Sequence, residues 1–93
     1  MNLIWNEAKR ASNLVRHGLD FASARLVLDS VHRLDVEIFR GDELRVMSFS
    51  YAVEVLAVLT VVHTARGKSV RIISFRPASN QECEVYYGWL ESK

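Results

Sequence analysis

Arginine, lysine and histidine side chains are the groups of this sequence that could do chemistry. The stretch between Glu54 and Glu82 contains no acidic residue. It contains four Arg or Lys residues, Arg66, Lys68, Arg71 and Arg76. Such cations stabilise the negative charge that a phosphodiester gains when a 2′-hydroxyl attacks it, while one further group accepts a proton and another donates one. The composition therefore suits RNA cleavage.

A second basic segment without acids lies between Glu7 and Asp20. It holds Lys9, Arg10, Arg16 and His17. His17 has the ordinary pKa of a proton acceptor near neutral pH, although a histidine beside Gly18 also suits the C-terminal end of a helix. If the two basic segments converge in space, they form a phosphate-binding patch. The alternative is that both are solvated faces.

The motifs of several other classes of enzyme are absent. There is no Gly-rich phosphate loop and no nucleophile elbow. Cys83 is the only cysteine, which excludes an internal disulfide and a metal site made of cysteines alone. His17, His32 and His63 lack the spacing of metal ligands. We expect no cofactor and no metal, and an enzyme of small metabolites is the least favoured function.

The composition is that of one small globular domain. The chain has 93 residues and a net charge of +1, which alone does not indicate nucleic acid binding. No signal peptide precedes Trp5, and no apolar run approaches the ~20 residues that a membrane-spanning helix needs. We expect a single domain over residues 1–93 that is cytoplasmic and contacts no membrane.

Two apolar runs, Leu56–Val62 and Val70–Arg76, flank a polar loop and predict an antiparallel hairpin at the centre of the fold. With Arg66 and Gly67 at its tip, side-chain alternation gives the hairpin a core face and a half-polar face. The core face holds Leu59, Val61, Val70 and Ile72, and Ser74 is also expected on the core side. The half-polar face holds Val58, Thr60, Val62, Thr64, Ser69, Arg71, Ile73 and Phe75.

Helix signals surround two short segments before the strands. Asn6 and Gly18 predict a helix over Glu7–His17, and Asp20 caps a second helix. The first helix is expected to bury Ala8, Ala11, Leu14 and Val15 and to leave Lys9, Arg10, Asn13, Arg16 and His17 on its sides and outer face. The second is expected to bury Phe21, Ala24, Val27 and Leu28.

The remaining segments complete an α+β fold. Leu3–Trp5 predicts a short edge strand, and period-two alternation predicts strands over His32–Phe39 and Leu44–Tyr51. Ser79 and Glu82 form a capping box that opens a last helix. The predicted order is a short N-terminal strand, two helices, a four-stranded antiparallel meander and a C-terminal helix.

Two blocks of residues resemble the signatures of a known family. The first block comprises Trp5, Asn6, Lys9, Asn13, Arg16–Leu19, Phe21 and Ala24. The second comprises Val61–Thr64, Arg66, Gly67, Arg71–Ser74, Arg76, Ala78, Glu82 and Tyr86. Together they resemble the N- and C-terminal signatures of BrnT-type toxins of bacterial type II toxin–antitoxin systems.

The resemblance implies a RelE-like fold and a metal-independent endoribonuclease that arrests translation. It also implies a cognate BrnA-type antitoxin, with a ribbon-helix-helix domain, that neutralises the toxin and through which alone the complex binds DNA. The near-neutral charge leaves a second function open. In that alternative the chain is a catalytically degenerate toxin fold that acts only within a DNA-binding repressor complex.

The resemblance and the basic segments together suggest roles for single residues. Arg76 is the first candidate for gripping the scissile phosphate, and its alternative role is an ion pair with a carboxylate such as that of Glu82. The full candidate catalytic set is Arg76, Arg71, His17 and Lys9. Arg66, Lys68, Arg16 and Tyr86 are expected to contact RNA. Tyr86 and Tyr87 either stack on bases or pack the last helix on the sheet.

Overall fold

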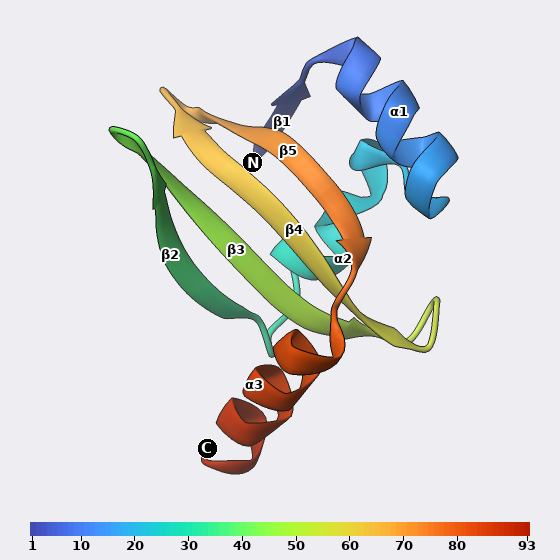
Figure 1. The fold of residues 1–93 in the computed structure, drawn as a ribbon, viewed down its shortest axis with the longest axis vertical. Coiled ribbons are helices and arrows are strands. Elements are labelled where there is room, and N and C mark those ends of the chain that lie inside the picture. Colours follow the sequence, from blue (N-terminus) through green and yellow to red (C-terminus); the bar gives the residue numbers. More distant parts are fainter.

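The fold consists of one sheet with helices on both of its sides (Figure 1). The computed structural model describes residues 1–93. The elements are β1 (Asn2–Trp5), α1 (Glu7–His17), the 3₁₀-helix η1 (Phe21–Ala24), α2 (Arg25–Leu28), β2 (Leu34–Arg40), β3 (Glu43–Ala52), β4 (Ala57–Arg66), β5 (Ser69–Pro77) and α3 (Asn80–Glu91). The predicted α+β class is therefore confirmed.

The sheet has five strands in the order β1-β5-β4-β3-β2. Strands β2 to β5 follow one another as antiparallel neighbours. Strand β1 lies at the edge and pairs with β5 in parallel. The sheet is consequently mixed, and the expected antiparallel meander is only part of it.

The tip of the β4–β5 hairpin differs from the prediction by one residue. Arg66 pairs with Ser69, so Gly67 and Lys68 form the turn instead of Arg66 and Gly67. Gly67 has a φ of 59°. A two-residue turn with positive φ at its first central position favours glycine there, and this requirement sets the register.

A β-bulge at Ile73 corrects the predicted faces of β5. His63 pairs with Ile72, but the preceding Val62 pairs with Ser74, which leaves Ile73 as an extra residue. The bulge reverses the side-chain alternation beyond it. Phe75 therefore lies in the core with 0% exposure, and Ser74 lies on the opposite face, so both predictions were wrong.

The main core lies between the sheet and the segment that contains η1 and α2. The four predicted residues of this segment, Phe21, Ala24, Val27 and Leu28, are all buried. They pack with Leu59, Val61, Ile72 and Phe75, and Val70 is partly buried against them. The segment begins as a 3₁₀-helix because the Ser23 N–H bonds to the carbonyl of Asp20, three residues back, at 2.8 Å.

Helix α1 has the predicted bounds but a different buried side. The Asn6 side chain accepts from the Lys9 N–H at 3.1 Å, and Gly18 ends the helix with a φ of 70°. Val15 is 89% exposed, which contradicts the predicted apolar stripe. Asn13 is buried instead, because α1 packs along the edge of β5 through this side chain.

The Asn13 amide extends the sheet where β1 stops. Strand β1 pairs with β5 only as far as Ile72. Farther along β5, Asn13 Nδ2 donates to the Phe75 carbonyl at 2.7 Å, and the Phe75 N–H donates to Asn13 Oδ1 at 3.2 Å. A side-chain amide thus satisfies both backbone groups of an edge residue.

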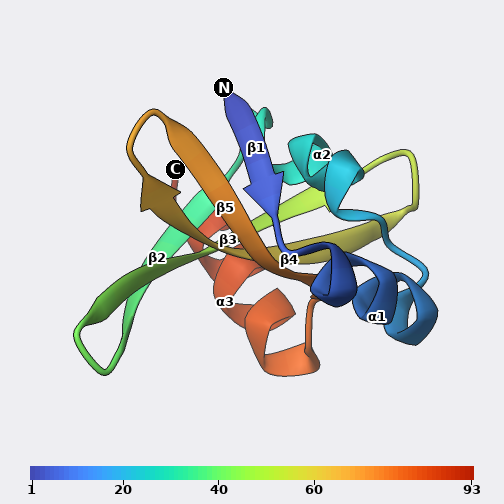
Figure 2. The ribbon, with the colours of Figure 1, turned by 90° about the horizontal axis from the view of Figure 1, so that it is seen from above.

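Helix α3 lies on the opposite side of the sheet from α2 (Figure 2). Its capping box is confirmed, because Glu82 N–H donates to Ser79 Oγ at 3.1 Å and Ser79 N–H donates to Glu82 Oε1 at 2.9 Å. Tyr86 packs with Phe49 and Val58. Because α3 covers only one end of this face, the rest of the face stays open.

Candidate functional site

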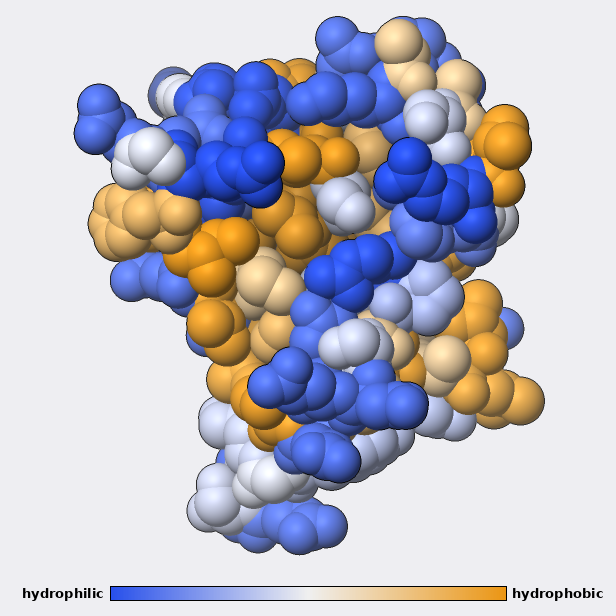
Figure 3. Space-filling view, viewed as in Figure 1, coloured by the Kyte–Doolittle hydropathy of each residue, from blue (hydrophilic) through white to orange (hydrophobic).

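The open face of the sheet is built from successive cross-strand rows. One row, Phe49–Thr60–Arg76, lies at the end that α3 covers. The next row, Met47–Val62–Ser74, lies beyond the helix, and Thr64–Arg71 follows nearer the β4–β5 tip. The space-filling view from this side shows apolar groups in the middle of the face, between hydrophilic groups at the upper left and on the right (Figure 3). The face is thus an apolar floor with a polar rim along β5.

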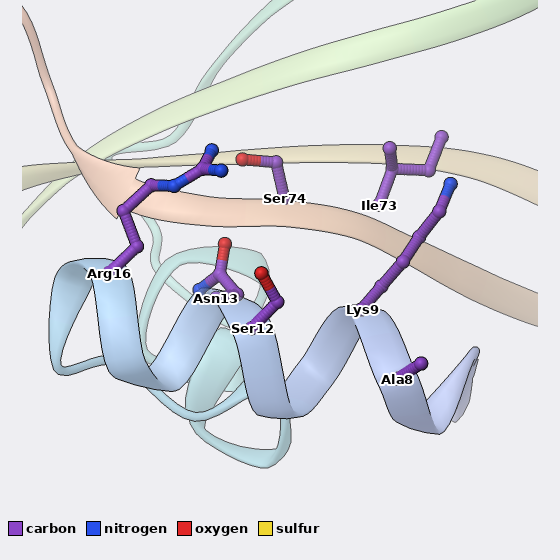
Figure 4. A pocket seen from close by; sticks show the side chains of 7 residues that line it. All are labelled: Ala8, Lys9, Ser12, Asn13, Arg16, Ile73 and Ser74. Carbon is purple, nitrogen blue, oxygen red and sulfur yellow. The ribbon is translucent and has the colours of Figure 1, made fainter.

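An open groove of about 370 Å³ runs between α1 and β5 (Figure 4). It is lined by Ala8, Lys9, Ser12, Asn13, Arg16, Ile73 and Ser74. The Lys9 and Arg16 side chains extend from the helix toward β5, and the Arg16 guanidinium points toward Ser74. A smaller hollow of about 90 Å³ is shared by Lys9 and Arg71. Three predicted residues, Lys9, Arg16 and Arg71, therefore lie along one surface.

Two of these cations carry charge that no carboxylate offsets. Lys9 and Arg16 are exposed and form no ion pair. Arg71 has one distant contact, at 3.6 Å, with Glu43 Oε2. By contrast, Arg10 on the same helix pairs with Glu7 and Asp20. The groove therefore offers positive charge to an anionic ligand.

One carboxylate, that of Glu43, is shared by three arginines near the β4–β5 tip. Glu43 Oε1 accepts from Arg45 Nε at 2.7 Å, and Oε2 accepts from Arg66 Nη2 at 2.8 Å. These hydrogen bonds lower the pKa of Glu43 from 4.5 to about 2. With Arg71 also near, the cluster keeps an excess of positive charge. Arg66, an expected RNA contact, is thus tied to a neighbouring strand.

Arg76 forms a bidentate ion pair with Glu82, the alternative role that the sequence left open. Nη1 donates to Glu82 Oε1 at 2.7 Å, and Nη2 donates to Oε2 at 2.9 Å. The Thr60 hydroxyl donates to Oε1 at 3.2 Å. The Arg76 hydrogen bonds are the largest cause that lowers the Glu82 pKa, from 4.5 to about 2, and they raise the Arg76 pKa.

The remaining predicted residues lie outside the groove. His17 follows Arg16 at the end of α1 but does not line the groove, and Lys68 occupies the hairpin turn. Tyr86 is 1% exposed, and its hydroxyl donates to the His32 carbonyl at 2.9 Å. Tyr86 thus packs α3 on the sheet, which is the second of the two roles that the sequence left open for it.

His63 belongs to a separate polar cluster on the core side of the sheet. The Ser48 hydroxyl donates to Asp35 Oδ1 at 2.6 Å and lies 2.8 Å from His63 Nε2. Ser48 is opposite core residue Val61. Burial lowers the pKa of His63. This cluster is not connected to the groove.

Sequence reasoning missed several residues of the site. Ser12 and Ser74 line the groove, and Glu43 organises the arginines near it. Ser12 lies one helical turn after Lys9, which is a local signal that points to the same helix face. Ser74 and Glu43 depend on the bulge and on strand pairing, for which the sequence has no local signal.

No group of three His, Cys, Asp or Glu side chains lies close enough to hold a metal ion. No helix has the length and apolar character that crossing a membrane requires.

Comparison with protein families gives one match. The family is described as ribonuclease toxin, BrnT, of type II toxin-antitoxin system, and its model matches residues 5–82. This range contains the whole first block, the second block as far as Glu82, and the whole α1–β5 groove. A comparison with curated proteins found no match.

Proposed function

Because the chain belongs to the BrnT family of type II ribonuclease toxins, we propose that it is an endoribonuclease that cleaves RNA along the α1–β5 groove. The observation that carries this proposal is the pair of cations without carboxylate partners, Lys9 and Arg16, whose side chains extend from α1 toward β5. RNA phosphates are attracted to such cations, and an open groove accommodates a single strand. We also propose that the fold of this chain is RelE-like.

The groove residues suggest how the reaction would proceed. The 2′-hydroxyl loses its proton and attacks the adjacent phosphorus, the bond to the 5′-oxygen of the next nucleotide breaks, and that oxygen takes up a proton from water, so the products are a cyclic phosphate and a 5′-hydroxyl. Lys9, Arg16 and Arg71 would stabilise the charge that the phosphate gains, so the proposed reaction needs no metal. His17 would accept the proton only from a strand that extends past Arg16. Arg66 and Lys68 would contact RNA beyond the groove.

Substitution of the unpaired cations tests this function. Lys9→Ala and Arg16→Ala should each slow RNA cleavage by the purified protein about tenfold or more, because each removes transition-state stabilisation. Neither change should alter the melting temperature, since both side chains are exposed and unpaired. Arg40→Ala is the matched control, because Arg40 is an exposed arginine without an ion pair at the end of β2. Cleavage within twofold of the unmodified protein in both groove variants would contradict the proposal.

The Arg76–Glu82 ion pair supports the second candidate function. An arginine held by an internal carboxylate suits a toxin fold that has lost activity and serves only inside a repressor complex. Expression of this chain alone in bacteria separates the two functions. Arrested growth with fragmented RNA supports the ribonuclease, whereas normal growth with intact RNA supports the binding module.

The family is that of type II systems, which pair a toxin with a protein antitoxin. We propose that the partner here is a BrnA-type ribbon-helix-helix protein and that the toxin arrests translation in the cytoplasm. Co-expression with such an antitoxin should restore growth and give a complex that survives purification.

A further inference from the structure

We propose that Arg76 and Thr60 form a phosphate-binding site that the Glu82 carboxylate occupies when RNA is absent. An RNA backbone phosphate and Glu82 would then compete for the same guanidinium. This inference rests on the proposed ribonuclease function and concerns the regulation of the same site. Helix α3 then has a regulatory role as well as a structural one, because Glu82 in its first turn is the competing anion.

The contacts of Glu82 are those that a phosphate would make. Guanidinium groups bind carboxylates and phosphates in the same bidentate geometry, through two parallel N–H···O bonds. Both Glu82 oxygens receive such bonds from Arg76, at 2.7 and 2.9 Å. The Thr60 hydroxyl adds a donor to the same Oε1. Two neighbouring strands thus present side-chain donors to one anion.

The proposed phosphate site at Arg76 and Thr60, called the masked site because Glu82 occupies it, borders the α1–β5 groove. Ser74 lines the groove, and Arg76 lies two residues farther along the same face of β5, about 7 Å away. The Arg76 side chain is 29% exposed, so solvent and ligand can reach it. A strand of RNA that follows the groove past Ser74 therefore arrives at Arg76.

Glu82 can leave Arg76 without moving the rest of α3. The helix is held by Tyr86, which is buried with Phe49 and Val58, and Trp89 and Leu90 pack against the same cluster. Its start is held separately, because the Glu82 N–H bonds to Ser79 Oγ. Rotation of the Glu82 side chain breaks only its carboxylate bonds to Arg76, Thr60 and the Ser79 N–H. The proposed exchange is thus a local side-chain event.

Binding of a single-stranded 2′-O-methyl RNA oligonucleotide tests the competition, because this probe binds but cannot be cleaved. Glu82→Gln should bind it at least ~threefold more tightly than the unmodified protein. The salt dependence should steepen by about 0.7 in log–log slope, as expected for one additional phosphate contact on a single strand. Glu84→Gln is the matched control, since it removes the same charge from an exposed position of α3 that forms no ion pair.

Two further variants separate competition from general electrostatics. Glu82→Asp keeps the net charge but shortens the side chain by one methylene, so it should bind RNA more tightly than the unmodified protein if the bidentate pair is the mask. In an Arg76→Ala background, Glu82→Gln should give no gain beyond that of Glu84→Gln. Melting temperatures verify that each variant is folded at the assay temperature. If Glu82→Gln is unfolded there, the affinity of Glu82→Asp decides the test.

Three outcomes would overturn the inference: equal affinities for Glu82→Gln and Glu84→Gln, a gain that persists without Arg76, or no binding of the oligonucleotide by any variant. Failure of the ribonuclease proposal looks different. Tighter binding by the Glu82 variants without cleavage of ordinary RNA would support the masked site and refute the enzyme.

Discussion

Glu82 titrates far below a free glutamate, and this makes part of the stability depend on pH. Its folded pKa is about 2 against an ordinary value of 4.5, chiefly because of Arg76. A lowered folded pKa gives stability that is present above the ordinary pKa and is lost as pH falls through the folded pKa. The Arg76–Glu82 pair should therefore lose its contribution between about pH 4.5 and pH 2.

We predict that Glu82→Gln flattens this acid transition. After allowance for solvent screening, the pair contributes roughly 1–2 kcal/mol to the free energy of unfolding at neutral pH. Thermal unfolding between pH 7 and pH 2 measures it, with Glu84→Gln as the control. A parallel fall in melting temperature for all three proteins would show that the ion pair contributes nothing to the acid transition.

Among the residues of α1, Asn13 is the one whose substitution should lower the free energy of unfolding most. Its Nδ2 donates to the carbonyls of both Phe75 and Leu19. Asn13→Asp replaces this donor with an oxygen that faces two carbonyl oxygens, and we expect the free energy of unfolding to fall by about 2–4 kcal/mol. Chemical denaturation measures the loss. Ser12→Ala, one residue away and exposed, should stay within about 0.5 kcal/mol of the unmodified protein.

At the scale of elements, two helix glycines should respond oppositely to alanine. Gly18 has a φ of 70° at the end of α1, where alanine is strained, so Gly18→Ala should destabilise by about 1 kcal/mol. Gly88 lies inside α3, and a Cβ there meets nothing within 4 Å. Gly88→Ala should therefore stabilise by about 0.5–1 kcal/mol. Denaturant midpoints of both variants test the contrast, and a shift of the same sign in both would contradict it.

The elements that the sequence predicts well are those fixed by local signals. The Asn6 and Gly18 caps define α1, and the Ser79 capping box defines the start of α3. These features depend on residues within one helical turn of each other, so a linear pattern is enough to find them.

Features that depend on distant pairing could not be predicted in this way. The Ile73 bulge follows from how β5 aligns with β4, and Asn13 is buried because β1 ends where the helix reaches β5. Of the candidate site, Lys9, Arg16 and Arg71 were predicted and do lie along one surface. The Glu43 partner of Arg66 required the strand register, whereas Glu82 could be named from the sequence as the alternative partner of Arg76.

At the scale of the whole molecule, charge predicts weak binding to duplex DNA. The net charge is +1, and most arginines outside the groove are paired with carboxylates. Nonspecific affinity rises with the number of phosphates neutralised. This chain alone should therefore not shift its operon's promoter in a mobility assay, whereas a complex with the antitoxin should. Tight, sequence-specific binding by the isolated chain would contradict this and would direct mutagenesis to the outer face of α1.

The bulge in β5 decides which side chains of this strand lie on the open face of the sheet. In a regular strand, residues on one face are separated by an even number of positions. Arg71 and Arg76 are separated by an odd number, yet both belong to the open face because Ile73 is left out of the pairing. If Ile73 were paired with β4 like an ordinary strand residue, every cationic residue would remain in the chain, yet Arg76 would turn toward the core and Phe75 toward solvent. The positive charge of this face therefore depends on the bulge, which fixes the side to which each later β5 side chain points, as much as on which residues the strand contains.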